Sequence, residues 1–132
     1  MKVLLSIKPE FVQRIMSGEK RFEYRRILFK RPVESVIVYS TMPEGRIVGE
    51  LRIGAILHDR VEALWERTRH QSGISLELFQ RYFSDKEVGY ALEIEEVIPY
   101  NKPIDPREVV DEFRAPQSFR YVGEEELLGA LG

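Results

Sequence analysis

Three successive segments with strand character, and no helical segment between them, most constrain the fold of this chain. Apolar and charged side chains alternate from Arg21 to Arg25, residues 35–39 are apolar on both faces, and residues 47–57 alternate again. Strands that follow one another closely pair antiparallel, because a parallel pair needs a long crossover between its members. The pattern favours an α+β fold with a mainly antiparallel or mixed, barrel-like sheet and flanking helices.

Irregularities in the alternation predict where the strands bend. Gly49 and Gly54 interrupt the segment over residues 47–57, and glycine inside a strand often marks a bend or bulge. Alternation resumes over residues 88–94 and changes phase at the Glu95-Glu96 pair. An extra residue in one strand shifts the phase in this way, so we expect a β-bulge there.

Helix boundaries are marked by capping residues. Pro9 suits a first turn, and Gly18 follows the last apolar position of the same segment. Asp59 and Glu62 have the spacing of a capping box, and Ser75 can cap the next helix. Further helices are predicted after Asp105 and over residues 124–131.

Length and composition limit the class of protein. With 132 residues, 43% of them hydrophobic and no cysteine, we expect a single domain over residues 1–132 without disulfides. The amino terminus lacks the apolar stretch of a signal peptide, and no run is long enough to span a membrane, which predicts a cytoplasmic protein. His58 and His70 are the only histidines, and we expect them at the surface, with no metal and no cofactor.

Basic side chains are concentrated in the first quarter of the chain. Residues 1–32 hold nine basic and three acidic side chains, whereas the other 100 residues hold eleven and nineteen. The net charge is −2 and the isoelectric point is about 5.8. The asymmetry favours an anionic partner at the basic segment, and the acidic remainder argues against indiscriminate binding to nucleic acid.

The first candidate site lies in the strip from Gly18 to Arg26. Glu23 and Arg25 are two residues apart on a predicted strand, so their side chains point to the same face. Lys20 joins that face only if the strand begins after it or is bulged. In a pocket, the arginine donor fork and the carboxylate could read the polar edge of a base. The alternative is a solvated strand face with weak ion pairs.

The second candidate site is the segment over residues 115–122 (APQSFRYV), which combines an amide, a hydroxyl, two aromatic rings and an arginine. Such a set suits stacking and base-edge hydrogen bonding, but the rings could equally plug the sheet. The hydroxyls of Ser40 and Thr41, at the end of the buried strand over residues 35–39, could line the same pocket or cap a turn. The candidate binding residues from these two places are Ser40, Thr41, Gln117, Ser118, Arg120 and Tyr121.

At these residues the sequence resembles the ASCH domain family of the PUA-like superfamily. Gly18, Lys20, Glu23 and Arg25 match the family pattern G-x-K-x-x-E-x-R, and the segments LLSIKPEF and PQSFRY are similar to those of small single-domain members. The resemblance implies a β-barrel with flanking helices and a cleft that binds RNA or a modified base. Lys8 is implied as a further residue of that cleft.

The resemblance also implies what the chain does. We expect a protein that binds RNA or a nucleoside-like molecule and acts in RNA metabolism or in the regulation of transcription or translation. Some small ASCH proteins are amidohydrolases that remove the acetyl group of N4-acetylcytidine with a lysine and a threonine. Lys20 matches that lysine, whereas Glu23 stands at the threonine position, so these two residues are the catalytic candidates of the alternative enzymatic hypothesis.

A third hypothesis is a protein-interaction adaptor. It would use the amphipathic helix over residues 75–83, with Phe79, Tyr82 or Phe83 in contact with the partner.

Overall fold

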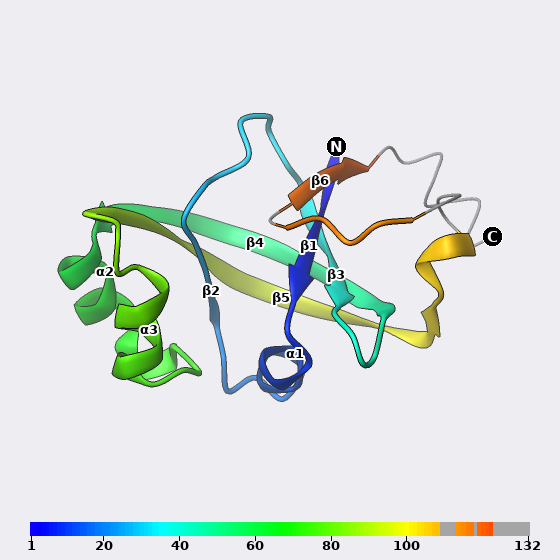
Figure 1. Ribbon diagram of the computed structural model, residues 1–132, viewed down its shortest axis with the longest axis horizontal. Helices are drawn as coiled ribbons and strands as arrows, with labels where there is room; N and C mark the ends of the chain where they lie inside the picture. The colour runs from blue at the N-terminus through cyan, green and yellow to red at the C-terminus, as the bar shows by residue number, and fades with distance from the viewer. Residues whose placement is uncertain (109–112, 118, 123–132) are drawn as a thin grey trace.

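The computed structural model describes residues 1–108, 113–117 and 119–122 (Figure 1). Its strands are β1 (Lys2–Ile7), β2 (Phe22–Arg25), β3 (Ser35–Ser40), β4 (Arg46–Arg60), β5 (Val88–Ile104) and β6 (Phe119–Val122). Its helices are α1 (Pro9–Met16), α2 (Val61–Thr68) and α3 (Leu76–Tyr82), with 3₁₀ turns at Arg69–Gln71 and Pro106–Glu108.

The six strands form one mixed sheet in the order β2-β5-β4-β3-β1-β6. β1 runs parallel to β3, and the other neighbouring strands are antiparallel, which confirms the predicted α+β class. The connection from β1 to β3 contains α1 and β2, which supply the length that a parallel pair needs. The sheet is open and curved rather than closed: its edge strands β2 and β6 have four residues each, and no pairing joins them among the described residues.

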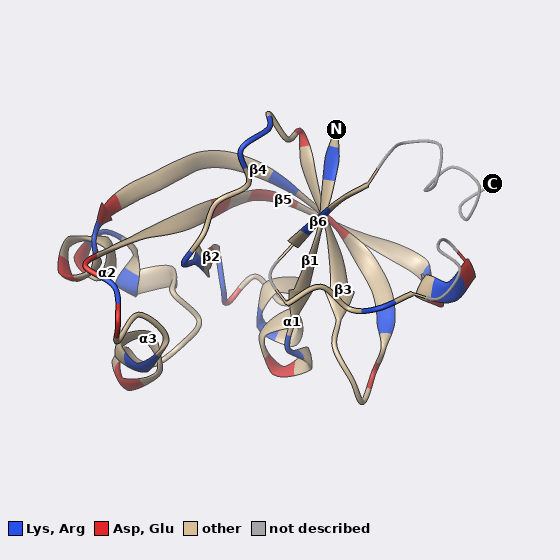
Figure 2. Ribbon diagram, turned by 45° about the horizontal axis from the view of Figure 1, so that its top comes forward, with Lys and Arg blue, Asp and Glu red and all other residues tan. Residues whose placement is uncertain are grey.

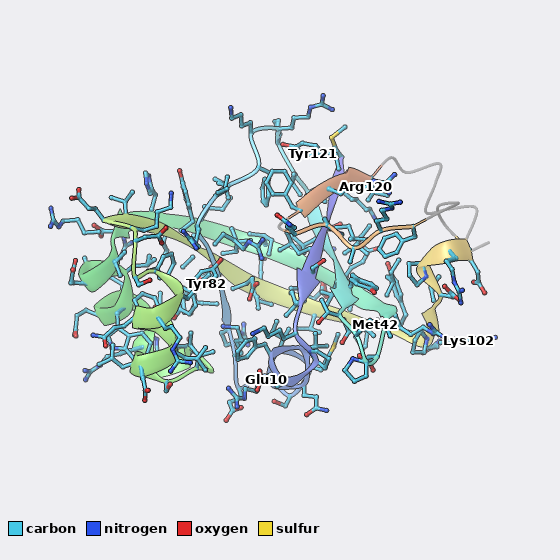
Figure 3. All side chains as sticks on the ribbon, in the orientation of Figure 1. Glu10, Met42, Tyr82, Lys102, Arg120 and Tyr121 are labelled. Atoms are coloured by element: carbon cyan, nitrogen blue, oxygen red, sulfur yellow. The ribbon has the colours of Figure 1, made fainter. Side chains whose placement is uncertain are left out.

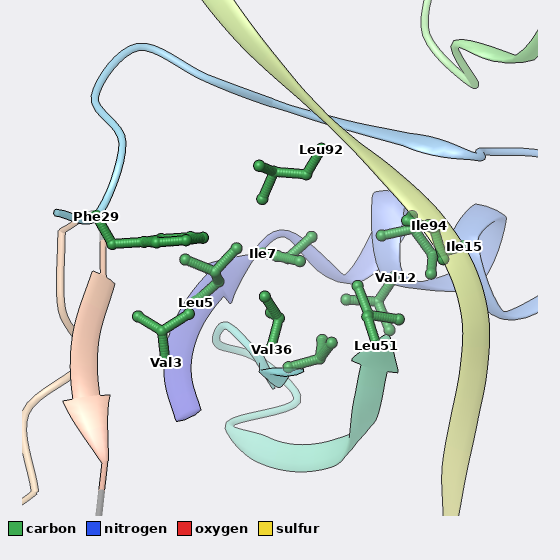
Figure 4. Packing of buried hydrophobic residues seen from close by; sticks show 11 residues of the cluster. Val3, Leu5, Ile7, Val12, Ile15, Phe29, Val36, Leu51, Leu92 and Ile94 are labelled. Atoms are coloured by element: carbon green, nitrogen blue, oxygen red, sulfur yellow. The ribbon is translucent and has the colours of Figure 1, made fainter. Parts of the chain in front are cut away.

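The main core lies between the sheet and α1 (Figure 4). Val3 and Leu5 from β1, Val36 from β3, Leu51 from β4 and Ile15 from α1 are almost completely buried there. These side chains come from residues that alternate along their strands or recur at helical spacing, as the sequence predicts. Their packing places α1 across the sheet beside β2.

A separate apolar cluster packs α2 and α3 against β2. It consists of Phe22 and Tyr24 from β2, Leu64 from α2, Phe79 from α3, Phe83 directly after α3, and Ala91 from β5. Figure 1 shows the two helices together at one end of the long β4–β5 ribbon. As a result, β2 lies between two packed clusters, and all four of its residues are buried.

Strand irregularities occur where the sequence predicts them. Between Arg52 and Ile53 of β4, the partner in β5 changes from Glu96 to Ile94, so Glu95 is the extra residue of a bulge. The other two register shifts between β4 and β5 fall at Gly49 and next to Gly54, where the sequence predicts bends. The bulge restores the inward direction of the apolar side chains on both sides of it.

Most predicted helix ends are confirmed, and one is wrong. Gly18 has a φ of +85° after α1, and the Ser75 hydroxyl accepts a hydrogen bond from a backbone N–H in the first turn of α3 at 3.1 Å. Asp59 does not cap α2. It belongs to β4, which continues in register with β5 as far as Arg60, so the helix begins only at Val61.

After β5, a 3₁₀ turn begins at Pro106, where the sequence predicts the start of a helix. The predicted terminal helix over residues 124–131 lies outside the described residues. In the described part of the chain, no helix combines the length and apolar character needed to cross a membrane. The same residues contain no group of three or more potential metal ligands, and His58 and His70 are exposed.

Candidate functional site

The charged side chains around β2 are buried rather than solvated. Lys20, Glu23 and Arg25 expose only 2%, 8% and 7% of their surface. In Figure 2, basic positions lie at both ends of β2, where the strand passes between α3 and α1. The expectation of a solvated strand face is therefore wrong, because β2 is enclosed by helices that lie far away in the sequence.

These three side chains line one pocket of about 280 Å³, here called the β2 pocket. Its walls come from the end of β1, α1, β2, α3 and the segment before β6. Tyr82, labelled in Figure 3, stands beside β2 on the α3 side. The lining residues are Ser6, Ile7, Lys8, Phe11, Lys20, Glu23, Tyr24, Arg25, Ile74, Leu78, Tyr82 and Gln117.

Lys20 is the most enclosed of the three charged residues. Its Nζ donates a hydrogen bond to the Ser72 carbonyl oxygen at 2.9 Å and lies 4.7 Å from the centre of the Tyr24 ring. Gly73, with a φ of +67°, passes against the stem of Lys20, and a Cβ on this glycine would lie 2.3 Å from the lysine Cβ. The segment before α3 thus fixes the position of the amine.

Burial lowers the pKa of the Lys20 amine below its ordinary value of 10.5. The nearby Glu23 carboxylate acts in the opposite direction, and the Arg14 guanidinium lowers the pKa further. The amine therefore loses its proton more readily than an exposed lysine does. An amine in this state can exchange a proton with a bound molecule.

Glu23 and Arg25 form an ion pair inside the pocket. The Nη1 of Arg25 donates to the Oε2 of Glu23 at 3.3 Å, and both side chains point to the same face of β2, as their spacing predicts. Their heads place a planar donor group next to a carboxylate acceptor. This arrangement can recognise a ligand edge that carries an acceptor and a donor side by side.

Tyr24 connects the pocket to α2. Its hydroxyl and the Thr68 Oγ1 are 2.7 Å apart, and the Thr68 hydroxyl lies 2.8 Å from the Leu64 carbonyl oxygen, to which it donates. Burial raises the pKa of Tyr24 to about 12. The phenol is therefore neutral near pH 7, and its ring forms a rigid apolar wall under the Lys20 amine.

The structure brings some of the sequence-predicted residues together and leaves others apart. Lys8 and Gln117 line the β2 pocket together with the three charged residues. Ser118 lies outside the described residues. The predicted residues that do not line this pocket are Ser40, Thr41, Arg120 and Tyr121.

Those four residues lie elsewhere in the fold. The Tyr121 hydroxyl accepts hydrogen bonds from the backbone N–H groups of Lys30 at 2.8 Å and Arg31 at 3.1 Å, so it holds the loop between β2 and β3. Arg120 lies on β6 opposite Leu4. The completely buried Ser40 ends β3, and the N–H of the next residue, Thr41, bonds the carbonyl of Ile7.

Sequence reasoning missed the apolar wall of the pocket. Phe11 comes from α1, Leu78 and Tyr82 come from α3, and Ile74 lies just before α3, and the helical positions have the ordinary spacing of core residues. The four-residue spacing from Leu78 to Tyr82 is the one signal that these two side chains share a helix face. Phe79 and Phe83, which the adaptor hypothesis places at a partner surface, are 1% and 2% exposed and belong to the core.

A larger and shallower groove of about 830 Å³ lies between α1 and the turn from β3 to β4. Its lining contains one charged side chain, that of Glu44, among mainly apolar residues and prolines. The smaller β2 pocket has more charged groups than this groove, and three of them are buried, so we take the β2 pocket as the candidate site.

Comparison with known proteins connects this pocket to a family. The model of the ASCH domain matches residues 5–103, well over half of the chain, including Lys20, Glu23 and Arg25. The chain belongs to the ASCH family. The resemblance seen in the Gly18–Arg25 motif is thus confirmed.

Relatives of this ASCH chain have been described and their structures solved. An ASCH domain-containing ribonuclease from Zymomonas mobilis is 28% identical over 95% of this chain and 86% of its own length. The crystal structure of ASCH from the same organism superposes with a TM-score of 0.91 at 27% identity, covering 98% of this chain and 93% of that chain. The N-terminal domain of Staphylothermus marinus McrB has a TM-score of 0.61 at 11% identity, which shows a shared fold alone.

Proposed function

We propose that this ASCH protein binds single-stranded RNA and holds one nucleobase in the β2 pocket. The observation that carries the proposal is the burial of Lys20, Glu23 and Arg25 around a cavity whose rim includes the exposed Lys8 and Gln117. Buried charges cost free energy, and a pocket that gathers them is a characteristic place for ligand recognition.

The pocket has the dimensions and chemistry for a base. Its volume of about 280 Å³ lies at the small end of ligand sites, which suits one nucleoside rather than a folded RNA element. Arg25 and Glu23 offer the donor and acceptor pattern that base edges require. Phe11 and Tyr82 contribute aromatic rings to the walls, next to which a base can stack.

The proposal of RNA as the source of the base is supported by the relative from Zymomonas mobilis, which is described as a ribonuclease. The overall negative charge of this chain favours selective capture over general coating of a polyanion. A role in RNA metabolism follows from this proposal, and it requires no cofactor.

Fluorescence anisotropy with a labelled single-stranded hexaribonucleotide of mixed sequence tests the proposal. Arg25→Gln and Lys20→Met should each weaken binding at least about tenfold, because each removes a charged donor from the pocket. Arg26→Gln is the matched control, since Arg26 pairs with Asp85 at the surface and does not line the pocket. Wild-type affinity in both pocket variants would contradict the site.

Competition separates RNA from a free nucleoside as the ligand. If RNA is the ligand, free nucleosides should displace the labelled hexaribonucleotide only at far higher concentration than the unlabelled strand does, because the strand adds phosphate contacts. Displacement by a nucleoside at equal concentration would assign the pocket to small molecules.

A second candidate function is hydrolysis at the same pocket. The lowered pKa of Lys20 and the adjacent Glu23 carboxylate favour it, because the two groups can share proton transfer to a leaving group and from a water. Two substrates test it in parallel: the hexaribonucleotide for strand cleavage, and N4-acetylcytidine for release of cytidine. Chromatography after incubation with excess enzyme should show a product that Lys20→Met and Glu23→Gln do not form.

A further inference from the structure

A row of three side chains leads from the β2 pocket across the sheet. Arg25 of β2 is the register partner of Tyr90 in β5, and Tyr90 is the register partner of His58 in β4. Directly opposed residues of antiparallel strands project from the same face. The row therefore begins at a pocket residue and ends on the outer part of the β4–β5 ribbon.

Two aromatic rings of this row are stacked. The centres of His58 and Tyr90 are 4.3 Å apart, and the ring planes differ by 13°. His58 is exposed and Tyr90 is partly exposed, so the stack lies at the surface rather than in the core. Among the described residues, β3 pairs with β4 only from Arg46 to Arg52, so no neighbouring strand covers the imidazole on its outer side.

The surroundings of the stack suit a nucleic acid. Arg60 lies two residues beyond His58 and thus on the same face, where its exposed guanidinium can reach a phosphate. Ile56 lies two residues before His58 on that face and is 42% exposed, which adds an apolar surface beside the rings. A flat aromatic surface next to a cation is the combination that binds single-stranded nucleic acids.

We propose that the His58–Tyr90 stack is a second base-binding subsite, on which the nucleotide next to the one in the β2 pocket stacks. This inference rests on the proposed function as an RNA-binding protein. Arg25 and His58 are two strand spacings apart, about 10 Å, so a strand that places one base beside Arg25 continues close to the imidazole. A base on the outer face of His58 would extend the column of rings by one member.

The test uses the hexaribonucleotide with 2-aminopurine placed at each position in turn, because the fluorescence of this base is quenched when it stacks. In the wild type, two neighbouring positions should respond to binding. His58→Val and Tyr90→Leu should abolish the response at one of them and weaken affinity about tenfold. Arg25→Gln should change the other position. His58→Phe, which retains a flat ring, should keep both responses.

Each outcome separates the two proposals. If the wild type binds the strand but His58→Val and Tyr90→Leu retain both responses and full affinity, the second subsite is overturned and the pocket proposal stands. If both variants lose both responses, the stack acts through the pocket, and the subsite is again overturned. If the wild type does not bind the hexaribonucleotide, the proposed function itself fails. Thermal melting of each variant verifies that the fold is retained.

Discussion

At the scale of single residues, Lys20 has the least ordinary environment in the described part of the chain. An amine that is 2% exposed has lost most of its hydration, and one hydrogen bond to Ser72 together with the Tyr24 ring replaces it. A lysine with no function in this position would be costly to retain. Its titration and its packing against Gly73 can be tested separately.

The lowered pKa of Lys20 predicts how stability depends on pH. In the unfolded chain the amine titrates near 10.5, so between the lowered folded pKa and 10.5 the unfolded state binds more protons. Stability from this group therefore rises with pH in that window, by at most about 1.4 kcal/mol per pH unit. Urea unfolding from pH 7 to 10 should show that wild type gains stability relative to Lys20→Met as pH rises. A constant difference between the two would contradict the pKa shift.

Gly73→Ala should disturb both stability and binding. The new Cβ would lie 2.3 Å from the Lys20 Cβ, and the φ of +67° strains an alanine. We expect a loss of about 2 to 3 kcal/mol in the free energy of unfolding and weaker RNA binding. Gly18→Ala is the control: its φ is +85°, but nothing lies within 4 Å of the added Cβ. It should cost about 1 kcal/mol and leave RNA affinity unchanged.

At the scale of secondary structure, the bulge in β5 controls which side chains reach the core. Before the bulge, Leu92 and Ile94 face the main core. After Glu95, the strand pairs with β4 again, with Glu96 opposite Arg52 and Val97 opposite Leu51. Because β2 pairs with residues 90 to 93 of β5, the register of β5 also determines where Glu23 and Arg25 lie along the pocket.

Deletion of Glu95 should therefore unfold or severely destabilise the protein. Without the extra residue, one part of β5 must turn its apolar side chains to solvent, at a cost of about 3 kcal/mol or more. Glu95→Ala retains the bulge and removes only an exposed side chain, so its stability should stay within about 0.5 kcal/mol of wild type. Thermal and urea unfolding measure both. Equal stability of the two variants would refute a role of register.

At the scale of the whole molecule, charge limits how RNA can be bound. The net charge is −2, and the basic excess is confined to residues 1–32, which include α1 and β2. A strand of RNA therefore meets more basic side chains along this segment than along the acidic remainder of the chain.

This distribution predicts a weak salt dependence of RNA affinity. With two or three phosphate contacts, the logarithm of the association constant should fall with the logarithm of salt concentration with a slope of about −2 for a single strand. Anisotropy titrations from 50 to 300 mM salt, about the range over which such slopes are resolved, give the value. A slope steeper than about −4 would indicate contact along a much longer charged surface.

Much of the local structure could be predicted from the sequence. The helix start at Ser75, the helix end at Gly18 and the bulge at Glu95 were predictable, because each depends on residues close along the chain. The prediction failed at Asp59, where pairing of β4 with β5 outweighed a local capping signal. The sequence also did not show that the barrel-like sheet stays open. Closure would need pairing between the edge strands β2 and β6, which lie far apart along the chain.

The sequence by itself determined the succession of strands, the phase of their side chains and the motif that places Glu23 and Arg25 on one face. These follow from the period of two in a strand, which neighbouring residues set. Only the tertiary structure decided that this face is a pocket. Its walls come from α1 and α3, and the groups that fix Lys20 lie about 50 residues further along the chain, at Ser72 and Gly73. Burial results from packing between such distant segments, so the local pattern alone could not distinguish a solvated strand from a binding site.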